Sequence, residues 1–171
     1  MQLTESVMAD QQTSAEIATT AKIGQHPLHP MLVPFPIAFL VATFSCDLAF
    51  WINGMPFMAQ MAFWALGAAL VGAVFAAIAG LIDFLNNDRI RAITDAWKHM
   101  IANVVAVVIA IISFFMRYRD GVDQAAGTWG VIASGVIVLL LLYSGWKGGE
   151  LVYRHRIGVL PSAPIDKSGK Y

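Results

Sequence analysis

The stretch Met61-Ala-Phe-Trp-Ala-Leu-Gly-Ala-Ala-Leu-Val-Gly-Ala-Val-Phe-Ala-Ala-Ile-Ala-Gly80 contains no charged side chain. A helix rises ~1.5 Å per residue, so about 20 apolar residues cross the ~30 Å hydrocarbon core of a bilayer. Lipid offers no hydrogen bonds to the backbone, and a spanning segment must therefore be a helix or a strand of a closed barrel. The stretch shows none of the apolar and polar alternation of a barrel strand. It therefore predicts a transmembrane helix.

Three further apolar segments have a similar length and composition. The four predicted spans cover residues 31–52, 57–82, 97–116 and 129–150. A turn at residues 53–56 and polar loops at residues 83–96 and 117–128 connect them, and such short connections make successive helices antiparallel neighbours. We therefore predict an all-α fold, an integral membrane four-helix bundle of up-down-up-down topology with both termini on the same side.

The polar ends of the chain set the domain boundaries. The predicted transmembrane domain covers residues 23–156, between a mobile polar N-terminal segment at 1–22 and a C-terminal tail at 157–171. No internal repeat is evident beyond the alternation of the spans. The chain thus forms a single membrane domain with short polar extensions.

The overall composition agrees with a membrane protein. Of 171 residues, 58% are hydrophobic and only 13% are charged, whereas about 25% are charged in a typical soluble domain. Eleven basic residues balance eleven acidic ones, so no basic excess favours a nucleic-acid partner. A single cysteine, Cys46, excludes an intramolecular disulfide, a four-cysteine metal site and haem attached through two cysteines.

The basic residues are distributed unevenly between the two ends of the bundle. We call the end with both termini and the 83–96 loop side A, and the opposite end side B. Side A carries nine of the eleven Lys and Arg residues, whereas side B carries Arg117 and Arg119. By the positive-inside rule, side A faces the cytoplasm. We therefore predict a multi-pass protein of the inner (plasma) membrane with both termini cytoplasmic.

Small and polar residues recur at helical spacing in two spans. In the second span, two series lie four residues apart: Gly72, Ala76 and Gly80, and Ala65, Ala69, Ala73 and Ala77. Small residues allow helix backbones to approach closely in lipid. In the third span, steps of four and three residues put one set on a single face: His99, Asn103, Ala106, Ala110 and Ser113. This face is either an inward packing surface with two polar residues at its end, or a site where Asn103 supports His99 as a ligand or proton carrier.

Asp47 is the only charged residue well inside a span. A carboxylate within the membrane is costly and usually faces the protein interior with a partner. Arg117 and Arg119, at the side-B end of the third span, are the natural candidates. The two interpretations are a structural interaction, either an ion pair or a protonated carboxyl in the bundle, and a proton relay.

All four histidines fall on side A: His26, His29, His99 and His155. Asp83 closes the second span on the same side. Histidine and carboxylate ligands from different helices suit a metal or haem site in a bundle core. The candidate metal ligands are thus the four histidines and Asp83, and the candidate ligands of a non-covalent haem b are the four histidines. The alternative is that all four are solvated interfacial residues.

The segment His26-Pro-Leu-His-Pro30 has its own constraints. A residue before proline is disfavoured in a helix and favours extended conformations. In polyproline II geometry, His26 and His29 would stand about 9 Å apart, too far to share one ion without a turn. This predicts separate roles, with one imidazole facing the bundle and the other facing water. Pro34 and Pro36 suit the first turn of the helix that follows, where an N–H is not needed.

These residues resemble an uncharacterised bacterial family of four-helix membrane proteins, a domain of unknown function whose members begin with a HPLHPMLVHFP-like segment. The resemblance covers residues 24–160 and rests on five matches: His26-Pro-Leu-His-Pro-Met-Leu-Val-Pro-Phe-Pro36, Asp47, Gly80-Leu-Ile-Asp-Phe84, His99 with Asn103, and Gly148-Gly-Glu-Leu-Val-Tyr-Arg-His155 with Gly158-Val159. Some relatives are fused to Rieske-type or cytochrome c-like domains, which implies a redox context. Pro34 stands where many relatives have a third histidine, so a site that used that histidine would be altered here.

Three functions are compatible with these features. The first is a redox-linked module that binds haem or a metal on side A and meets a redox partner protein. The second is an accessory or structural membrane subunit without a cofactor. The third is a small proton-coupled transporter using Asp47 and the histidines, which would require a homo-oligomer because four helices leave little room for a pore. The sequence shows no nucleophile with a positioned base, so catalysis other than electron transfer is not expected.

Overall fold

The computed structural model of the chain describes residues 17–159. The elements in chain order are β1 (Lys22–Ile23), β2 (His26–Pro27), α2 (Leu28–Leu32), α3 (Pro34–Asn53), α4 (Pro56–Asn86), α5 (Asp88–Arg91), α6 (Thr94–Asp120), α7 (Val122–Ala125) and α8 (Thr128–Tyr153). Most of the predicted mobile N-terminal segment and of the C-terminal tail, residues 1–16 and 160–171, lies outside the described residues.

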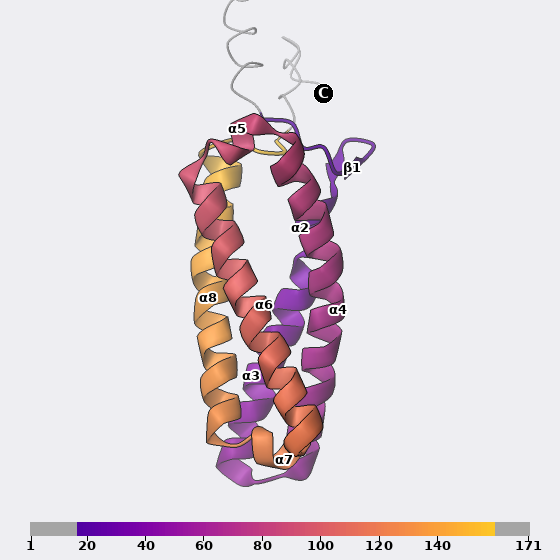
Figure 1. Cartoon of the computed structure of the whole chain (residues 1–171), viewed down its shortest axis with the longest axis vertical. Helices are drawn as coiled ribbons and strands as arrows, with labels where there is room; N and C mark the ends of the chain where they lie inside the picture. The colour runs from indigo at the N-terminus through magenta and orange to yellow at the C-terminus, as the bar shows by residue number, and fades with distance from the viewer. Residues whose placement is uncertain (1–16, 160–171) are drawn as a thin grey trace, which may run out of the picture.

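The long helices form an antiparallel bundle (Figure 1). Helix α3 packs on α4 and α6 packs on α8, while α3 with α8 and α4 with α6 close the bundle. Within residues 17–159, four segments are long and apolar enough to cross a membrane: Leu28–Asn53, Pro56–Asn86, Thr94–Asp120 and Thr128–Tyr153. The predicted all-α bundle with up-down-up-down topology is therefore confirmed, with α3 and α6 diagonally opposite each other.

The helices extend further than the predicted spans. The loop predicted at residues 83–96 is largely helical, because α4 continues to Asn86 and α5 follows it. The loop predicted at 117–128 begins inside α6 and contains α7. Hydropathy marks only the part of a helix that lies in hydrocarbon, whereas the helix continues until the backbone stops it. Gly54 and Gly121 provide such stops, with φ of 67° and 96° after α3 and α6.

The sequence predicted an extended histidine–proline segment, but only its first part is extended. Pro27 is extended, with ψ of 130°, but Leu28 then begins α2 and His29 lies in its first turn. Pro30 is the third residue of this helix, where an N–H has no partner within the helix in any case. Val33 has helical angles and joins α2 to α3, so Pro34 and Pro36 fall in the first turn of α3 as predicted.

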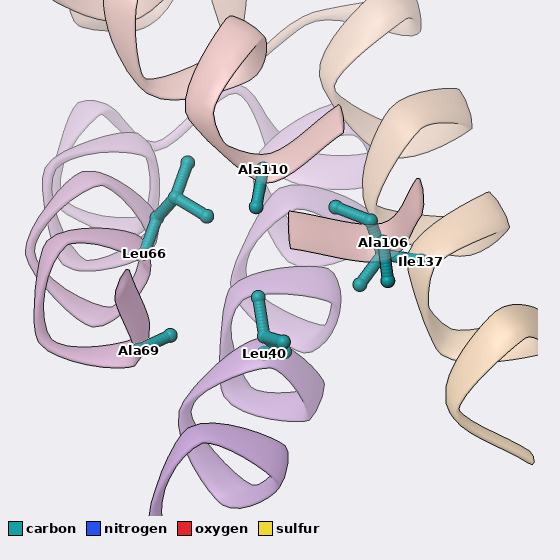
Figure 2. Close-up of a cluster of buried hydrophobic side chains, with 6 residues drawn as sticks. All are labelled: Leu40, Leu66, Ala69, Ala106, Ala110 and Ile137. Atoms are coloured by element: carbon teal, nitrogen blue, oxygen red, sulfur yellow. The ribbon is translucent and has the colours of Figure 1, made fainter. Parts of the chain in front are cut away.

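The bundle has a core of small residues and an outer surface of large ones. Ala69 of α4 and Ala106 and Ala110 of α6 are fully or almost fully buried. They pack with three larger side chains in a cluster of Leu40, Leu66, Ala69, Ala106, Ala110 and Ile137 (Figure 2). Large apolar side chains such as Trp64, Phe75 and Leu139 are more than half exposed. Small residues inside and large ones outside are typical of helices that pack against one another in lipid.

One of the predicted small-residue series in α4 does not follow the interface. Ala69 is buried but Ala77, two steps further in the same series, is exposed. An α-helix has 3.6 residues per turn, so a strict four-residue spacing moves about 40° around the helix at each step. The buried positions instead alternate steps of three and four, as in Ala59, Ala62, Leu66 and Ala69.

The two described ends of the chain meet on side A. Ile17 forms a parallel bridge with Ile157, and β1 pairs with β2 beside α2. A small apolar cluster of Ile17, Phe84, Ile90 and Ala96 lies beneath them. Figure 1 shows these segments at the same end as α5, opposite α7. Residues 17–22, which the sequence placed in the mobile segment, are therefore packed on the bundle.

Candidate functional site

Two of the four histidines lie together inside side A. The rings of His29, on α2, and His99, on α6, have centroids 6.0 Å apart and are nearly perpendicular at 87°. Both side chains are half-buried. They come from diagonally opposite helices, so their contact lies across the middle of the bundle.

Each of these imidazoles is held by a backbone carbonyl of a neighbouring helix. His29 Nδ1 lies 2.8 Å from Ala76 O on α4, and His99 Nδ1 lies 2.8 Å from Ser144 O on α8. A carbonyl oxygen can only accept a hydrogen bond, so Nδ1 must carry the proton in both rings. In the neutral imidazole the lone pair is then on Nε2, the tautomer that a metal-binding histidine has when a carbonyl orients its other nitrogen.

A glycine makes room for each ring. A Cβ atom at Gly80 would lie 2.8 Å from His29 Nδ1, and one at Gly148 would lie 3.2 Å from His99 Cε1. Each glycine follows the carbonyl acceptor, Ala76 or Ser144, by four residues on the same helix. One helical turn therefore provides both the acceptor and the space for the imidazole.

His99 has polar neighbours in addition to the carbonyl. Asn103 Nδ2 lies 2.6 Å from Ser144 Oγ, 2.9 Å from His99 O and 3.2 Å from His99 Nε2. Ser144 Oγ is 3.0 Å from His99 Nδ1, and Ser144 is almost fully buried. The predicted face of the third span is thus confirmed as inward, since Ala106, Ala110 and Ser113 are buried along it.

The sequence made Asp83 a candidate metal ligand together with the histidines, but the structure shows its carboxylate in contact with the N-terminal segment. Its Oδ1 accepts hydrogen bonds from the backbone N–H groups of Thr20 and Ala21, at 2.6 Å and 2.7 Å. Asn87, one turn later, donates from Nδ2 to Ala18 O at 3.0 Å. The end of α4 therefore holds the N-terminal segment, and the carboxylate is engaged in that role.

The other two histidines lie apart from the pair. His26 is exposed in β2. His155 Nε2 lies 3.6 Å from Asp95 Oδ2, and Lys147 Nζ lies 2.9 Å from Asp95 Oδ1. Within residues 17–159, no three His, Cys, Asp or Glu side chains are placed to hold one metal ion. Of the five candidate ligands, His29 and His99 are the two whose side chains the structure brings into contact.

Asp47 is paired with Arg117, one of its two predicted partners. Arg117 Nη1 donates to Asp47 Oδ1 at 2.8 Å and Nη2 donates to Oδ2 at 2.7 Å, and both side chains are fully buried. Arg117 Nε also lies 3.4 Å from Ser113 Oγ. Arg119 instead pairs with its neighbour Asp120 on the surface. The bidentate geometry occupies both carboxylate oxygens, and it ties α3 to α6 near side B.

The sequence alone did not identify the residues that hold the two imidazoles in place. Ala76 and Ser144 contribute backbone carbonyls, which any residue type carries, so no side chain marks them. Gly80 and Gly148 did give a signal, because each stands in a motif shared with the resembling family. Pro34, which replaces a histidine common in that family, is exposed at the first residue of α3.

Comparison with known proteins agrees with this architecture. A family model described as "Predicted membrane protein (DUF2231)" matches residues 25–161, which includes the histidine pair and the buried ion pair. Neither the curated proteins nor the solved structures gave a match. The match confirms the resemblance to an uncharacterised membrane family, and because it covers most of the chain, the chain belongs to this family of predicted membrane proteins, DUF2231.

Proposed function

We propose that this chain is a redox-linked membrane module that binds a transition metal through His29 and His99. The observation that carries the proposal is the pair of imidazoles in edge-to-face contact, each with its Nδ1 fixed on a carbonyl of another helix. Metal-ligating histidines are commonly oriented in this way, because the bond at one nitrogen sets the tautomer and the direction of the other.

The spacing of the rings suits shared coordination. With metal–nitrogen bonds of ~2.0–2.1 Å, two imidazoles on one ion have ring centres about 5–6 Å apart. The observed separation is 6.0 Å. Imidazole nitrogen suits copper, zinc, iron and nickel, and histidine also binds the iron of haem. The bound group would be a bare ion or the iron of a haem b, and copper or iron would supply one-electron transfer, which zinc cannot.

The protein residues have distinct parts in this site. His29 would bind the ion through Nε2, and His99 would do so once the Asn103 amide, 3.2 Å from His99 Nε2, turns away. The backbone carbonyls of Ala76 and Ser144 hold the two rings. The charged clusters at Asp83 and Asp95 lie on the same side of the membrane and are engaged with the backbone and with Lys147. With the chain in the inner membrane, side A faces the cytoplasm by the positive-inside rule. A redox partner protein, or a second copy of the chain, would approach the site from that side.

The test uses the full-length protein purified in mild detergent. Metal content is measured by mass spectrometry, and a reduced-minus-oxidised visible spectrum detects haem. Copper, zinc and haemin are then titrated separately. We expect His29→Gln and His99→Gln each to weaken binding of one of these probes at least tenfold, because each removes one of two protein ligands.

The other two histidines provide matched controls. His26 is exposed and His155 faces Asp95, so His26→Gln and His155→Gln should leave the affinity unchanged. Folded protein that contains no metal or haem, and that takes up none of the three probes, contradicts the proposal. Equal effects of all four substitutions contradict it as well.

The same contacts favour a second candidate, a cofactor-free accessory subunit. His29 joins α2 to α4 and His99 joins α6 to α8 through hydrogen bonds to carbonyls, and such bonds stabilise helix association in lipid without any ligand. In that case His29→Gln and His99→Gln lower thermal stability in metal-free protein, and native purification recovers the chain with a membrane partner. Recovery of the chain by itself counts against this candidate.

A further inference from the structure

Two polar contacts across the bundle join residues at matching places in its two halves. The first half is the hairpin of α2, α3 and α4, residues 28–86, and the second is the hairpin of α6, α7 and α8, residues 94–153. His29 contacts His99, and Asp47 contacts Arg117. In both contacts the second residue lies 70 positions after the first. The two contacts are therefore in the same register.

The buried faces of the helices continue this register. Four buried residues of α3 are followed 70 positions later by four buried residues of α6: Pro36, Leu40, Thr43 and Asp47 correspond to Ala106, Ala110, Ser113 and Arg117. Four buried residues of α4 are followed 68 positions later by the buried residues of α8: Ala62, Leu66, Ala69 and Ala76 correspond to Gly130, Ser134, Ile137 and Ser144. The connection between the helices is thus two residues shorter in the second half.

Glycine contacts between the halves are reciprocal. A Cβ at Gly67 of α4 would lie 3.3 Å from Phe114 of α6, and a Cβ at Gly135 of α8 would lie 3.4 Å from Phe44 of α3. Gly67 corresponds to Gly135 and Phe44 to Phe114 in the same two registers. A two-fold interface has this property, because a contact from one side to the other must occur again in reverse.

Each half holds its histidine through the same kinds of contact. His29 packs on Gly80 beside the Ala76 carbonyl, and His99 packs on Gly148 beside the Ser144 carbonyl. Amphipathic packing alone matches buried positions between any two helices, but it does not match imidazoles, their carbonyl acceptors and their glycines. In a two-fold arrangement only residues on the axis contact their own counterparts. The His29–His99 and Asp47–Arg117 contacts therefore mark two points on that axis.

We propose that the two hairpins form a pseudo-two-fold pair, and that the Asp47–Arg117 contact on the axis selects the partner of each hairpin. The partner surface is the inward face of a hairpin of the same kind with the opposite charge at this position. Each half thus pairs with the other half of the chain rather than with its own counterpart in a second copy. This pairing stands whether or not His29 and His99 bind a metal ion.

The charges give this selection its physical basis. Two first halves brought together would place Asp47 against Asp47, and two second halves would place Arg117 against Arg117. Like charges buried on one axis lack a counter-charge where no water can screen them, which is costly in a membrane. Specificity of this kind depends on the repulsion in the wrong pair as well as on the attraction in the right one.

The surroundings of the arginine make the proposal testable in detail. Ser113 faces Arg117 Nε, and a Cβ at Gly130 would lie 3.1 Å from Arg117 Nη2. The counterparts of these residues around position 47 are Thr43 and Ala62. An arginine moved to position 47 would find a hydroxyl at Thr43, but the methyl group of Ala62 would stand where Gly130 now leaves space.

The experiment exchanges the two charges in the full-length protein and follows the melting temperature, Tm, in detergent. We expect D47R and R117D alone each to lower Tm by about 10 °C, because each leaves two like charges buried. The exchanged chain, D47R with R117D, should recover at least half of that loss. Adding A62G should raise the Tm of the exchanged chain further, because it recreates the space of Gly130.

The sign of the A62G effect is the decisive control. Ala62 is fully buried in the native chain, so A62G alone should lower Tm there while it raises Tm in the exchanged chain. R119D, at the exposed pair with Asp120, should leave Tm nearly unchanged. An exchanged chain no more stable than the single variants overturns the proposal, as does an A62G substitution that lowers Tm in both backgrounds.

Discussion

A single methyl group at Gly80 tests how closely His29 is seated on α4. The Cβ of Gly80→Ala would lie 2.8 Å from His29 Nδ1, closer than a normal contact allows, so the ring must move. The Cβ of Gly148→Ala would lie 3.2 Å from His99 Cε1, a contact that a shift of a few tenths of an ångström relieves. A Cβ at Gly145, on the same helix as Gly148, would point into open space, with nothing within 4 Å beyond its chain neighbours and the local helix backbone.

These distances rank the three substitutions. Alanine in a helix is favoured over glycine by about 0.5–1 kcal/mol, which all three gain. At Gly80 the loss of the His29–Ala76 hydrogen bond costs about 0.5–1.5 kcal/mol and overpacking costs about 1–3 kcal/mol. The net expectation is destabilisation by about 0.5–4 kcal/mol for Gly80→Ala, less for Gly148→Ala, and stabilisation by up to about 1 kcal/mol for Gly145→Ala.

The assay is equilibrium unfolding in mixed micelles, with helicity measured by circular dichroism, together with titration of the metal bound by the native protein. Gly80→Ala should weaken metal binding at least tenfold because it displaces one ligand, whereas Gly145→Ala should bind as the native chain does. If Gly80→Ala and Gly145→Ala prove equally stable and bind the metal equally, His29 is not held against α4 and the reasoning fails.

Three further predictions concern the ion pair, the N-terminal segment and the topology. Asp47→Asn or Arg117→Met should each lower the free energy of unfolding by about 3–5 kcal/mol, while replacement of both by apolar residues should lower it much less. A double-mutant cycle measures this difference, and additive losses would show that the pair is uncoupled. Asp83→Ala should speed hydrogen exchange at the Thr20 and Ala21 amides about tenfold, because it removes their acceptor, and Asp83→Asn should not. In a Cys46→Ser background, an impermeant maleimide should label Asp123→Cys but not Lys22→Cys in intact spheroplasts, and the reverse pattern would place side A outside.

Hydropathy was sufficient to predict the four helices, because the bilayer requires long apolar helices whatever their partners. It could not identify their inward faces, since lipid and core are both apolar. Residue size carried that information instead: Ala106 and Ala110 were assigned correctly from steps of three and four, whereas Ala77 was assigned wrongly from a strict spacing of four. The helix ends were missed because polar residues beyond the hydrocarbon still form helix.

The site was predicted in part. His29, His99 and Asn103 do come together, and Asp47 does meet Arg117, because charged and polar groups in a bundle must find one another. Asp83 was assigned to the wrong neighbours, because its carboxylate accepts backbone N–H groups from Thr20 and Ala21, an interaction with no signature in side-chain types. The two-fold register was missed for a similar reason, since its halves share contacts rather than obvious sequence similarity.

The position of the two axial contacts also bears on transport through the bundle. His29 and His99 meet near side A, and Asp47 and Arg117 meet near side B, at opposite ends of the same axis. Between them lies the apolar cluster that includes Leu40, Leu66 and Ile137, all almost fully buried. A proton path along the axis needs hydrogen-bonding groups or water throughout, and an apolar, closely packed layer provides neither.

Asp47 already has both oxygens bonded to Arg117, so releasing it as a proton carrier would leave a buried guanidinium unpaired. The arrangement therefore favours a binding module at side A, stabilised by the ion pair at side B, over a monomeric proton pathway connecting the two ends.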